Sequence, residues 1–110
     1  MPTPANAPTE ARALSNFLEA MAAEKGSARN TLLAYGRDLM QAAEWLAGQG
    51  TSLTGATREQ VEGYLVALEA EGLSQATRAR RLSALKQFYR FAFDEGWRSD
   101  NPTLRIDGRS

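Results

Sequence analysis

The sequence predicts an all-α fold, a compact bundle of four or five helices in a single domain, and three observations support this. Ala and Leu are abundant, whereas Val occurs twice and Ile once in 110 residues, so strands have little support. Apolar residues recur at spacings of three and four from residue 9 onward. Gly, Ser, Thr and Pro interrupt this pattern at intervals, which is typical of helices joined by short loops.

The first two helices are expected to fill the first half of the chain. Thr9 is the expected N-cap of the first helix, which runs to about Glu24 and is ended by Gly26. Ser27 should cap a second helix of about 20 residues, followed by a loop at 48–55. The residues expected to face the core are Leu14, Phe17, Leu18 and Met21 in the first helix and Leu32, Tyr35, Leu39, Ala43 and Leu46 in the second.

The third and fourth helices have clear start and stop signals. Residues 57–60 (TREQ) fit the capping-box pattern, and Gly72 should close the third helix. Ser74 should cap a fourth helix that ends at Gly96. The expected core residues are Val61, Leu65 and Leu68 in the third helix and Leu82, Leu85, Phe88, Tyr89, Ala92 and Phe93 in the fourth. The expected outer face of the fourth helix holds Thr77, Arg80, Ser83, Ala84, Gln87 and Arg90.

Phe91 falls outside the predicted core stripe of the fourth helix. It is expected either to be covered by a neighbouring domain or partner, or to be a lone exposed aromatic residue. At the two ends of the chain, residues 1–8 hold three of the four prolines and indicate a flexible lead-in. Asn101-Pro102 breaks any helix, so residues 9–100 are expected to form the domain and 101–110 the start of a connection.

The composition excludes several classes of function. The chain has no Cys and no His, which excludes disulfides, thiolate and His metal sites, and His-based acid–base catalysis. The other polar residues form no known catalytic motif, so we expect a chain that is not an enzyme by itself and needs no cofactor or metal. No apolar run approaches the roughly 20 residues that span a bilayer, and the N-terminus lacks the features of a secretory signal. A cytoplasmic location and no membrane contact are expected.

Positive charge is concentrated on two segments of a chain whose net charge is zero. Residues 74–90 carry five basic side chains and no acid, and residues 25–37 carry three basic side chains and no acid. Residues 40–73 balance them with five Glu and one Arg. A helix with several Arg is often only a solvated face, but solvated helices commonly interleave acids and bases at i, i+4. The second and fourth helices are therefore predicted to bind nucleic acid.

Three segments resemble one protein family. SARNTLLAYGRDL (27–39), LSQATRARRLSALKQFYRF (73–91) and Asn101-Pro102 are similar, in order and spacing, to segments of tyrosine recombinases of the Xer and phage-integrase type, with the XerD-like branch the best fit. The resemblance covers roughly residues 10–103. It implies a SAM-like core-binding N-terminal domain, whose second and fourth helices face the major groove of a DNA half-site. Residues 101–110 would then begin a linker to a catalytic domain absent from this chain.

The resemblance also implies a set of DNA contacts. On the second helix they are Ser27, Arg29, Asn30, Thr31 and Tyr35, and on the fourth they are Ser74, Gln75, Thr77, Arg78, Arg81 and Lys86. The periodicity of the fourth helix agrees on Thr77 but favours Arg80 and Gln87 over Arg78 and Arg81, which lie nearer the core edge. Because long Arg side chains can extend along an apolar surface to reach solvent, both sets are retained.

The implied parent enzyme breaks and rejoins DNA strands through a phosphotyrosine and needs no cofactor. In the Xer branch it resolves chromosome dimers, and related enzymes integrate DNA. Its implied partners are double-stranded DNA and other recombinase subunits in a synaptic tetramer, while the isolated domain is expected to be monomeric. The family's catalytic residues belong to the C-terminal domain, so Tyr35, Tyr64 and Tyr89 are not expected to be nucleophiles.

Two other functions remain open from the residues. A SAM-like helical module could bind a protein through its acidic third helix. A helix-turn-helix regulator could use the third and fourth helices, joined by the turn at 72–74. Against the second alternative, the third helix is long for that motif, and Arg78 falls where an apolar residue is needed.

Overall fold

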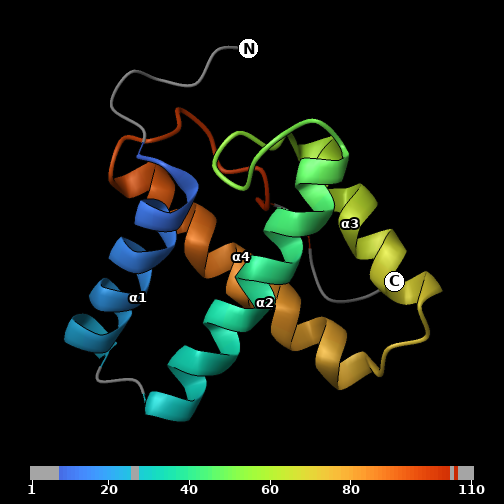
Figure 1. The fold of residues 1–110 in the computed structure, drawn as a ribbon, viewed down its shortest axis with the longest axis horizontal. Helices are drawn as coiled ribbons and strands as arrows, with labels where there is room; N and C mark the ends of the chain where they lie inside the picture. The colour runs from blue at the N-terminus through green and yellow to red at the C-terminus, as the bar shows by residue number, and fades with distance from the viewer. Residues whose placement is uncertain (1–7, 26–27, 105, 107–110) are drawn as a thin grey trace.

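Four α-helices joined by short loops make up the fold (Figure 1). The computed structural model describes residues 8–25, 28–104 and 106, and no strand is present among them. The helices are α1 (Glu10–Lys25), α2 (Arg29–Gly48), α3 (Arg58–Ala70) and α4 (Gln75–Asp94). The predicted all-α bundle of four helices is therefore confirmed.

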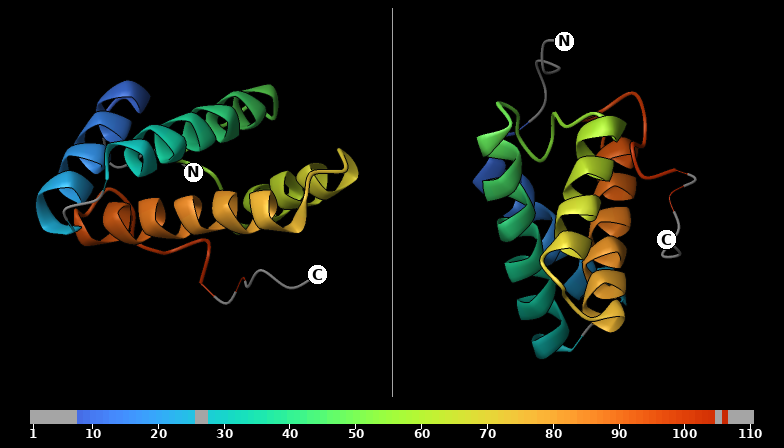
Figure 2. Two further views of the ribbon diagram at one scale, coloured as in Figure 1. Left: turned by 90° about the horizontal axis from the view of Figure 1, so that it is seen from below. Right: turned by 90° about the vertical axis from the view of Figure 1, so that its right-hand side faces the viewer.

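Helix α2 contacts each of the other three helices. It crosses α4, as Figure 1 shows. Figure 2 shows that α1 and α2 lie on one side of the molecule and that α3 and α4 lie on the other. The segment that follows α4 runs along the side of α4 that faces away from α1 and α2 (Figure 2).

The core lies between these two pairs of helices and is built from the apolar stripes that the sequence predicts. Most of the predicted core residues are buried or packed against the buried cluster. Phe17 of α1 meets the ring of Phe88 of α4 edge-on, with ring centroids 5.6 Å apart. The largest fully buried side chains are those of Phe17, Leu39, Leu46, Leu53, Val61, Leu68, Leu85, Phe88, Tyr89 and Pro102.

Three expectations about α4 were wrong. Phe93, expected in the core, is 49% exposed, and Ala84, expected on the outer face, is fully buried. Phe91 is neither lone nor left for a partner to cover, because its ring packs 5.8 Å from Phe17 and 5.3 Å from Trp97. The buried side of α4 is thus turned toward α2 and α1 relative to the predicted stripe.

The helix ends follow local signals where these can be described. Thr9 accepts a hydrogen bond from the Arg12 amide, Thr57 and Gln60 form the capping box, and Ser74 accepts from the Thr77 amide. These predicted caps are confirmed. The predicted roles of Gly26 and Ser27 lie outside the described residues, and Ala28 occupies the N-cap position of α2 without a side-chain hydrogen bond.

Gly50, Gly72 and Gly96 follow the ends of α2, α3 and α4, and all three have a positive φ, of 80°, 78° and 78°. At Gly96 the amide bonds the carbonyl oxygen of Phe93, and the next amide, of Trp97, bonds that of Ala92. This pattern is the Schellman motif, in which a left-handed residue closes a helix. Gly72 and Gly96 thus stop the third and fourth helices as predicted.

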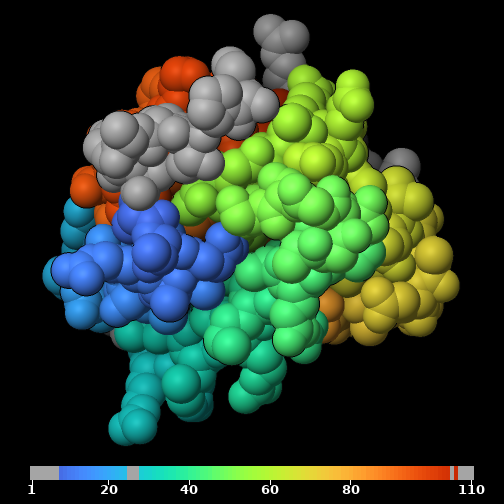
Figure 3. All heavy atoms as spheres, turned by 45° about the horizontal axis from the view of Figure 1, so that its top comes forward, coloured from blue at the N-terminus to red at the C-terminus, as the bar shows by residue number. Residues whose placement is uncertain are grey.

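The loop between α2 and α3 is tied to three other parts of the chain. The Leu53 amide donates to Oε1 of Glu10 at 2.8 Å, and the Leu53 carbonyl accepts from the Tyr89 hydroxyl at 2.6 Å. Nη1 of Arg98 donates to the Thr54 carbonyl at 2.8 Å. Figure 3 shows this loop, in green, packed beside α1, in blue. The loop is therefore an integral part of the packed structure.

The segment after α4 packs back on the helices. Trp97, Pro102, Thr103 and Ile106 are all buried. The side chain of Asn101 accepts hydrogen bonds from the amide of Thr103 at 2.9 Å and from its hydroxyl at 2.6 Å, which forms a tight turn. Across the described residues, none of the helices has the length and apolar character needed to cross a membrane.

Candidate nucleic-acid interface

Helices α2 and α4 both begin at the lower edge of the molecule in Figure 1. Arg29, Asn30 and Thr31 in the first turn of α2 are exposed, as are Ser74 and Gln75 at the start of α4. The first amides of a helix have no intrahelical partner and point outward along the axis, where they favour an anion. Two such helix starts, each with polar side chains, therefore share one edge of the protein.

The basic side chains of α2 and α4 are accessible to different degrees. Arg29, Arg37, Arg80 and Arg90 are exposed, whereas Lys86 is half-buried. Neither helix carries an acid in its first turn. Phosphate groups would thus meet little opposing charge at the starts of these helices.

A buried carboxylate lies between the two helices. Asp38 of α2 is 3% exposed, although no acid was predicted in the core. Its carboxylate accepts hydrogen bonds from Nε of Arg80 at 2.9 Å and from Nη2 of Arg80 at 3.0 Å. These bonds and the charge of Asp38 raise the pKa of Arg80. The paired geometry links α2 to α4 across 42 residues of sequence.

Arg81 lies on the inner side of the same carboxylate. Its Nε is 3.7 Å from Oδ1 of Asp38, and its side chain is only 15% exposed. The buried Tyr64 hydroxyl is close to this guanidinium, but neither this hydroxyl nor Nε of Arg81 has a well-formed hydrogen bond within the described chain. Burial raises the pKa of Tyr64, and the positive charge of Arg81 opposes that rise. Arg81 therefore belongs mainly to the interior.

Two other predicted contacts also make intramolecular bonds. Nε of Arg78 donates to the Leu73 carbonyl at 3.3 Å, which holds the turn before α4. The Tyr35 hydroxyl is 3.4 Å from the Ser83 hydroxyl, and this is a second link between α2 and α4. Both side chains are half-buried, so each offers only part of its surface to a ligand.

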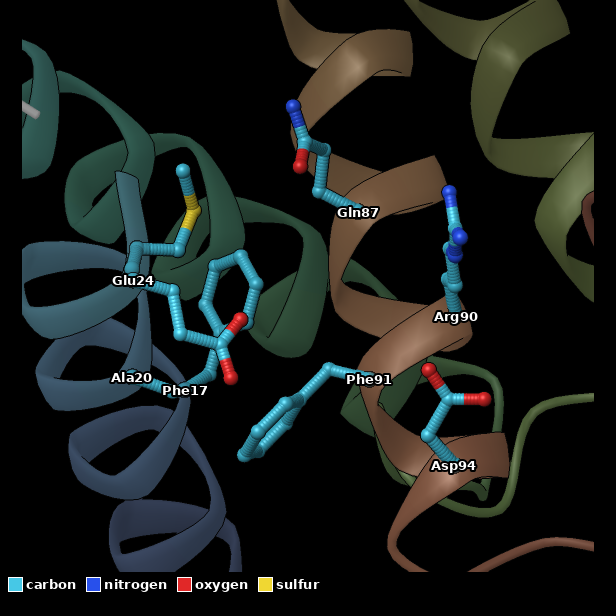
Figure 4. Close-up of a pocket in the computed structure, with 8 residues that line it drawn as sticks. Phe17, Ala20, Glu24, Gln87, Arg90, Phe91 and Asp94 are labelled. Carbon is cyan, nitrogen blue, oxygen red and sulfur yellow. The ribbon is translucent and has the colours of Figure 1, made fainter.

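Gln87 lies elsewhere, at a hollow of about 210 Å³ between α1 and α4 (Figure 4). Phe17 and Phe91 line this hollow together with the carboxylates of Glu24 and Asp94, while Arg90 adds a positive charge. The two acids oppose the approach of a phosphate. The surroundings of Gln87 therefore differ from the starts of α2 and α4, which have no acid in their first turns.

The predicted site residues thus fall into groups. The starts of α2 and α4 both lie along the lower edge of the molecule in Figure 1, that of α2 at the left and that of α4 at the right. Arg80 is paired with Asp38 between these helices, Gln87 lies at the hollow, and Ser27 is outside the described residues. Asp38 was missed. Its spacing of three from Tyr35 and four from Ala42 places it on the inner side of α2, and this signal could have identified it. No cluster of metal-binding side chains occurs in the described ranges.

The fold is a small domain of four helices, two of which begin with exposed polar side chains and no acid, and comparison with known families identifies its class. Residues 14–96 match the N-terminal SAM-like domain of phage integrases. The chain belongs to this family. The resemblance predicted from the sequence is therefore confirmed.

Individual relatives carry a more specific name. The chain is 53% identical over 90 residues to tyrosine recombinase XerD of Caulobacter vibrioides, covering 82% of this chain and 30% of the relative. It is 48% identical over 95 residues to tyrosine recombinase XerD of Brucella suis, covering 86% and 31%. The protein of that name from Rhizobium meliloti is 48% identical over 91 residues, covering 83% and 29%. The chain thus spans about three tenths of the length of these relatives.

Proposed function

We propose that this chain is the DNA-binding domain of a site-specific tyrosine recombinase and that it holds one recombination half-site through α2 and α4. The observation that carries the proposal is the shared edge at which both helices begin, with exposed Arg29, Asn30 and Ser74. The match to the SAM-like domain of phage integrases supports it. The absence of acids between residues 74 and 90 supports it as well.

Each helix start has its own part in this function. Arg29, Asn30 and Thr31 on α2 contact one stretch of backbone and the adjoining base edges, and Ser74, Gln75 and Thr77 on α4 contact another. Free amides at both starts bind phosphate oxygens. Lys86 contributes charge further along α4. Tyr35, Arg78 and Arg81 act mainly by holding these helices in place, because their polar atoms face other parts of the chain.

The function of the whole parent protein is inferred from the relatives named tyrosine recombinase XerD. The parent breaks and rejoins DNA in the cytoplasm, through catalytic residues outside the segment that this chain matches. In this role it resolves chromosome dimers or integrates DNA, and it acts with other recombinase subunits in a synaptic tetramer. The present domain supplies binding and part of the half-site recognition.

A salt titration of duplex binding tests the proposal. The logarithm of the affinity of this chain for a mixed-sequence 20-base-pair duplex should fall linearly with the logarithm of salt, with a slope of about −0.9 per phosphate contacted. Arg29→Ala and Lys86→Ala should each make that slope shallower by about one. Arg58→Ala on α3 is the matched control, since Arg58 pairs only weakly with Glu62 at 3.5 Å. No duplex binding at low salt would refute the proposal.

A second candidate is a protein-binding module that uses α3. One observation favours it: Val66 is 66% exposed on a helix that also presents Glu59, Glu62 and Glu69. Val66→Ser should then weaken binding to a basic protein partner and leave duplex binding unchanged. Arg29→Ala should weaken duplex binding and leave binding to the protein partner unchanged.

A further inference from the structure

The guanidinium of Arg80 has hydrogen-bonding capacity that the protein itself does not use. It carries five N–H donors, of which one on Nε and one on Nη2 bond to Asp38. Those are its only hydrogen bonds within the described residues. The opposite edge, made by Nη1 and the second hydrogen of Nη2, belongs to a side chain that is 48% exposed.

Asp38 is suited to hold this guanidinium in one orientation. Its carboxylate is buried and is attached to the middle of α2, a 20-residue helix that the core fixes in place. A bidentate bond from a planar guanidinium fixes both direction and rotation, which a single contact does not. The Arg80 side chain therefore has few rotamers left to lose when its free edge binds a ligand.

We propose that Asp38 is a positioning residue for DNA binding, which holds Arg80 so that the free edge of its guanidinium meets a pair of acceptor oxygen or nitrogen atoms on the duplex. Two sources on DNA present such a pair, the oxygens of a phosphate and the O6/N7 edge of guanine. The inference rests on the proposed DNA-binding function. It adds a buried acid, which does not itself touch DNA, to the residues that make binding possible.

Charge alone predicts the opposite effect for this residue. Asp38→Asn removes a negative charge close to the binding surface, so simple electrostatics predicts tighter binding to the polyanion. Positioning predicts weaker binding, because the Asn amide can accept from only one of the two Arg80 donors. The sign of the change in duplex affinity of Asp38→Asn therefore distinguishes positioning from simple electrostatics.

A double-mutant cycle on duplex binding uses this difference. Affinity for a mixed-sequence 20-base-pair duplex is measured at low salt for this chain and for Asp38→Asn, Arg80→Ala, the double variant and the control Arg58→Ala. We expect Arg80→Ala and Asp38→Asn each to weaken binding by about five- to hundredfold, the range for one bidentate contact. In the Arg80→Ala background, Asp38→Asn should leave binding unchanged or tighten it. Equal or tighter binding by the single Asp38→Asn variant would overturn the inference.

Arg80→Lys keeps the result interpretable if Asp38→Asn unfolds. It retains the charge on a half-exposed side chain but loses the planar fork. If Asp38 positions Arg80, Arg80→Lys should lose about as much duplex affinity as Arg80→Ala. A purely electrostatic role predicts parental affinity for Arg80→Lys, and that result would count against the inference. Folding of every variant is verified by far-ultraviolet circular dichroism and urea unfolding.

Nuclear magnetic resonance gives a readout that a merely structural ion pair would not change. The Nε–H signal of Arg80 should be protected from solvent exchange with and without duplex, because it remains on Asp38, while the Nη signals should shift when duplex is added. Unchanged Nη signals, or a loss of Nε–H protection on binding, would show that Arg80 does not bind DNA from its place on Asp38.

Duplex containing 7-deazaguanine identifies the acceptor. If Arg80 contacts guanine N7, the modified duplex should bind the parent more weakly and Arg80→Ala equally well; equal binding of the two duplexes by the parent assigns a phosphate. Failure of the parent to bind any duplex would remove the proposed function itself. Normal binding by the parent with no effect of Arg80 or Asp38 variants would remove only this inference.

Discussion

The Tyr89 hydroxyl donates a 2.6 Å hydrogen bond to the Leu53 carbonyl oxygen and so joins α4 to the loop between α2 and α3. Both residues are fully buried. Burial raises the pKa of Tyr89, so the hydroxyl keeps its proton and its role as a donor across the physiological range. The bond spans 36 residues of sequence, and no local pattern requires it.

Tyr89→Phe should lower the free energy of unfolding by about 1–3 kcal/mol, because the Leu53 carbonyl would be left without this partner in a buried site. The measurement is equilibrium unfolding in urea. Tyr35→Phe is the control, since its longer 3.4 Å contact with Ser83 is only partly buried. A Tyr89 variant no less stable than the Tyr35 variant would show that this bond contributes nothing.

Glu10 should make stability depend on pH in the weakly acidic range. Burial raises its pKa above the unfolded value of 4.5, although the hydrogen bond from the Leu53 amide acts in the opposite direction. The folded state therefore binds a proton more readily than the unfolded state. The resulting stability is present below pH 4.5 and is lost as pH rises through the raised pKa.

Glu10→Gln should remove this contribution while retaining an oxygen that accepts from Leu53. Urea midpoints measured from pH 4 to 7 should show that the stability of the variant relative to the parent increases as pH rises. Parallel curves for the two proteins over that range would contradict the expected titration.

Two glycines at the end of α2 should respond in opposite ways to alanine. Neither Gly48 nor Gly50 has an atom within 4 Å of the position that a Cβ would occupy. Gly50 has a φ of 80°, so Gly50→Ala should cost about 1–2 kcal/mol in the left-handed region. Gly48→Ala should stabilise by up to about 1 kcal/mol, because Gly48 lies in the helix. The measurement is the midpoint temperature of thermal unfolding. A shift of this midpoint in the same direction for both variants would contradict this account of the helix end.

The two aromatic residues Phe88 and Phe93 should differ sharply in their contribution to stability. Phe88 is fully buried, whereas Phe93 is 49% exposed. Phe88→Ala should cost about 3–5 kcal/mol, as large-to-small changes in cores do. Phe93→Ala should cost less than about 1 kcal/mol. Urea unfolding of the pair tests the orientation of α4, since similar losses would indicate that Phe93 is also buried.

The parts of the fold that depend on neighbouring residues could be predicted from the sequence. Thr57, Ser74 and Gly96 act within one turn of their own positions, so their roles follow from residue type and spacing. The stripes through Phe17, Leu39 and Leu85 follow from helical periodicity. Local chemistry is sufficient for these features.

The parts that depend on distant residues could not be predicted. Periodicity orders the residues around α4 but does not say which neighbours surround it, so Ala84, Phe91 and Phe93 were placed wrongly. For the candidate site, the positive charge of α2 and α4 could be identified, but not its internal pairing. Asp38 and Arg80 are 42 residues apart in sequence and join two helices, and counting charges along the chain does not show this pair.

The packing of Trp97 described above, together with that of Trp45, gives the protein two intrinsic fluorescent reporters at separate places. Trp45 of α2 lies 5.7 Å from the ring of Tyr64 of α3. Trp97 is 6% exposed and lies 5.3 Å from Phe91 and 6.5 Å from Phe88. In Trp45→Phe, emission would follow the docking of the segment after α4, and in Trp97→Phe it would follow the packing of α2 on α3. Each interface can thus be observed alone, without an added dye.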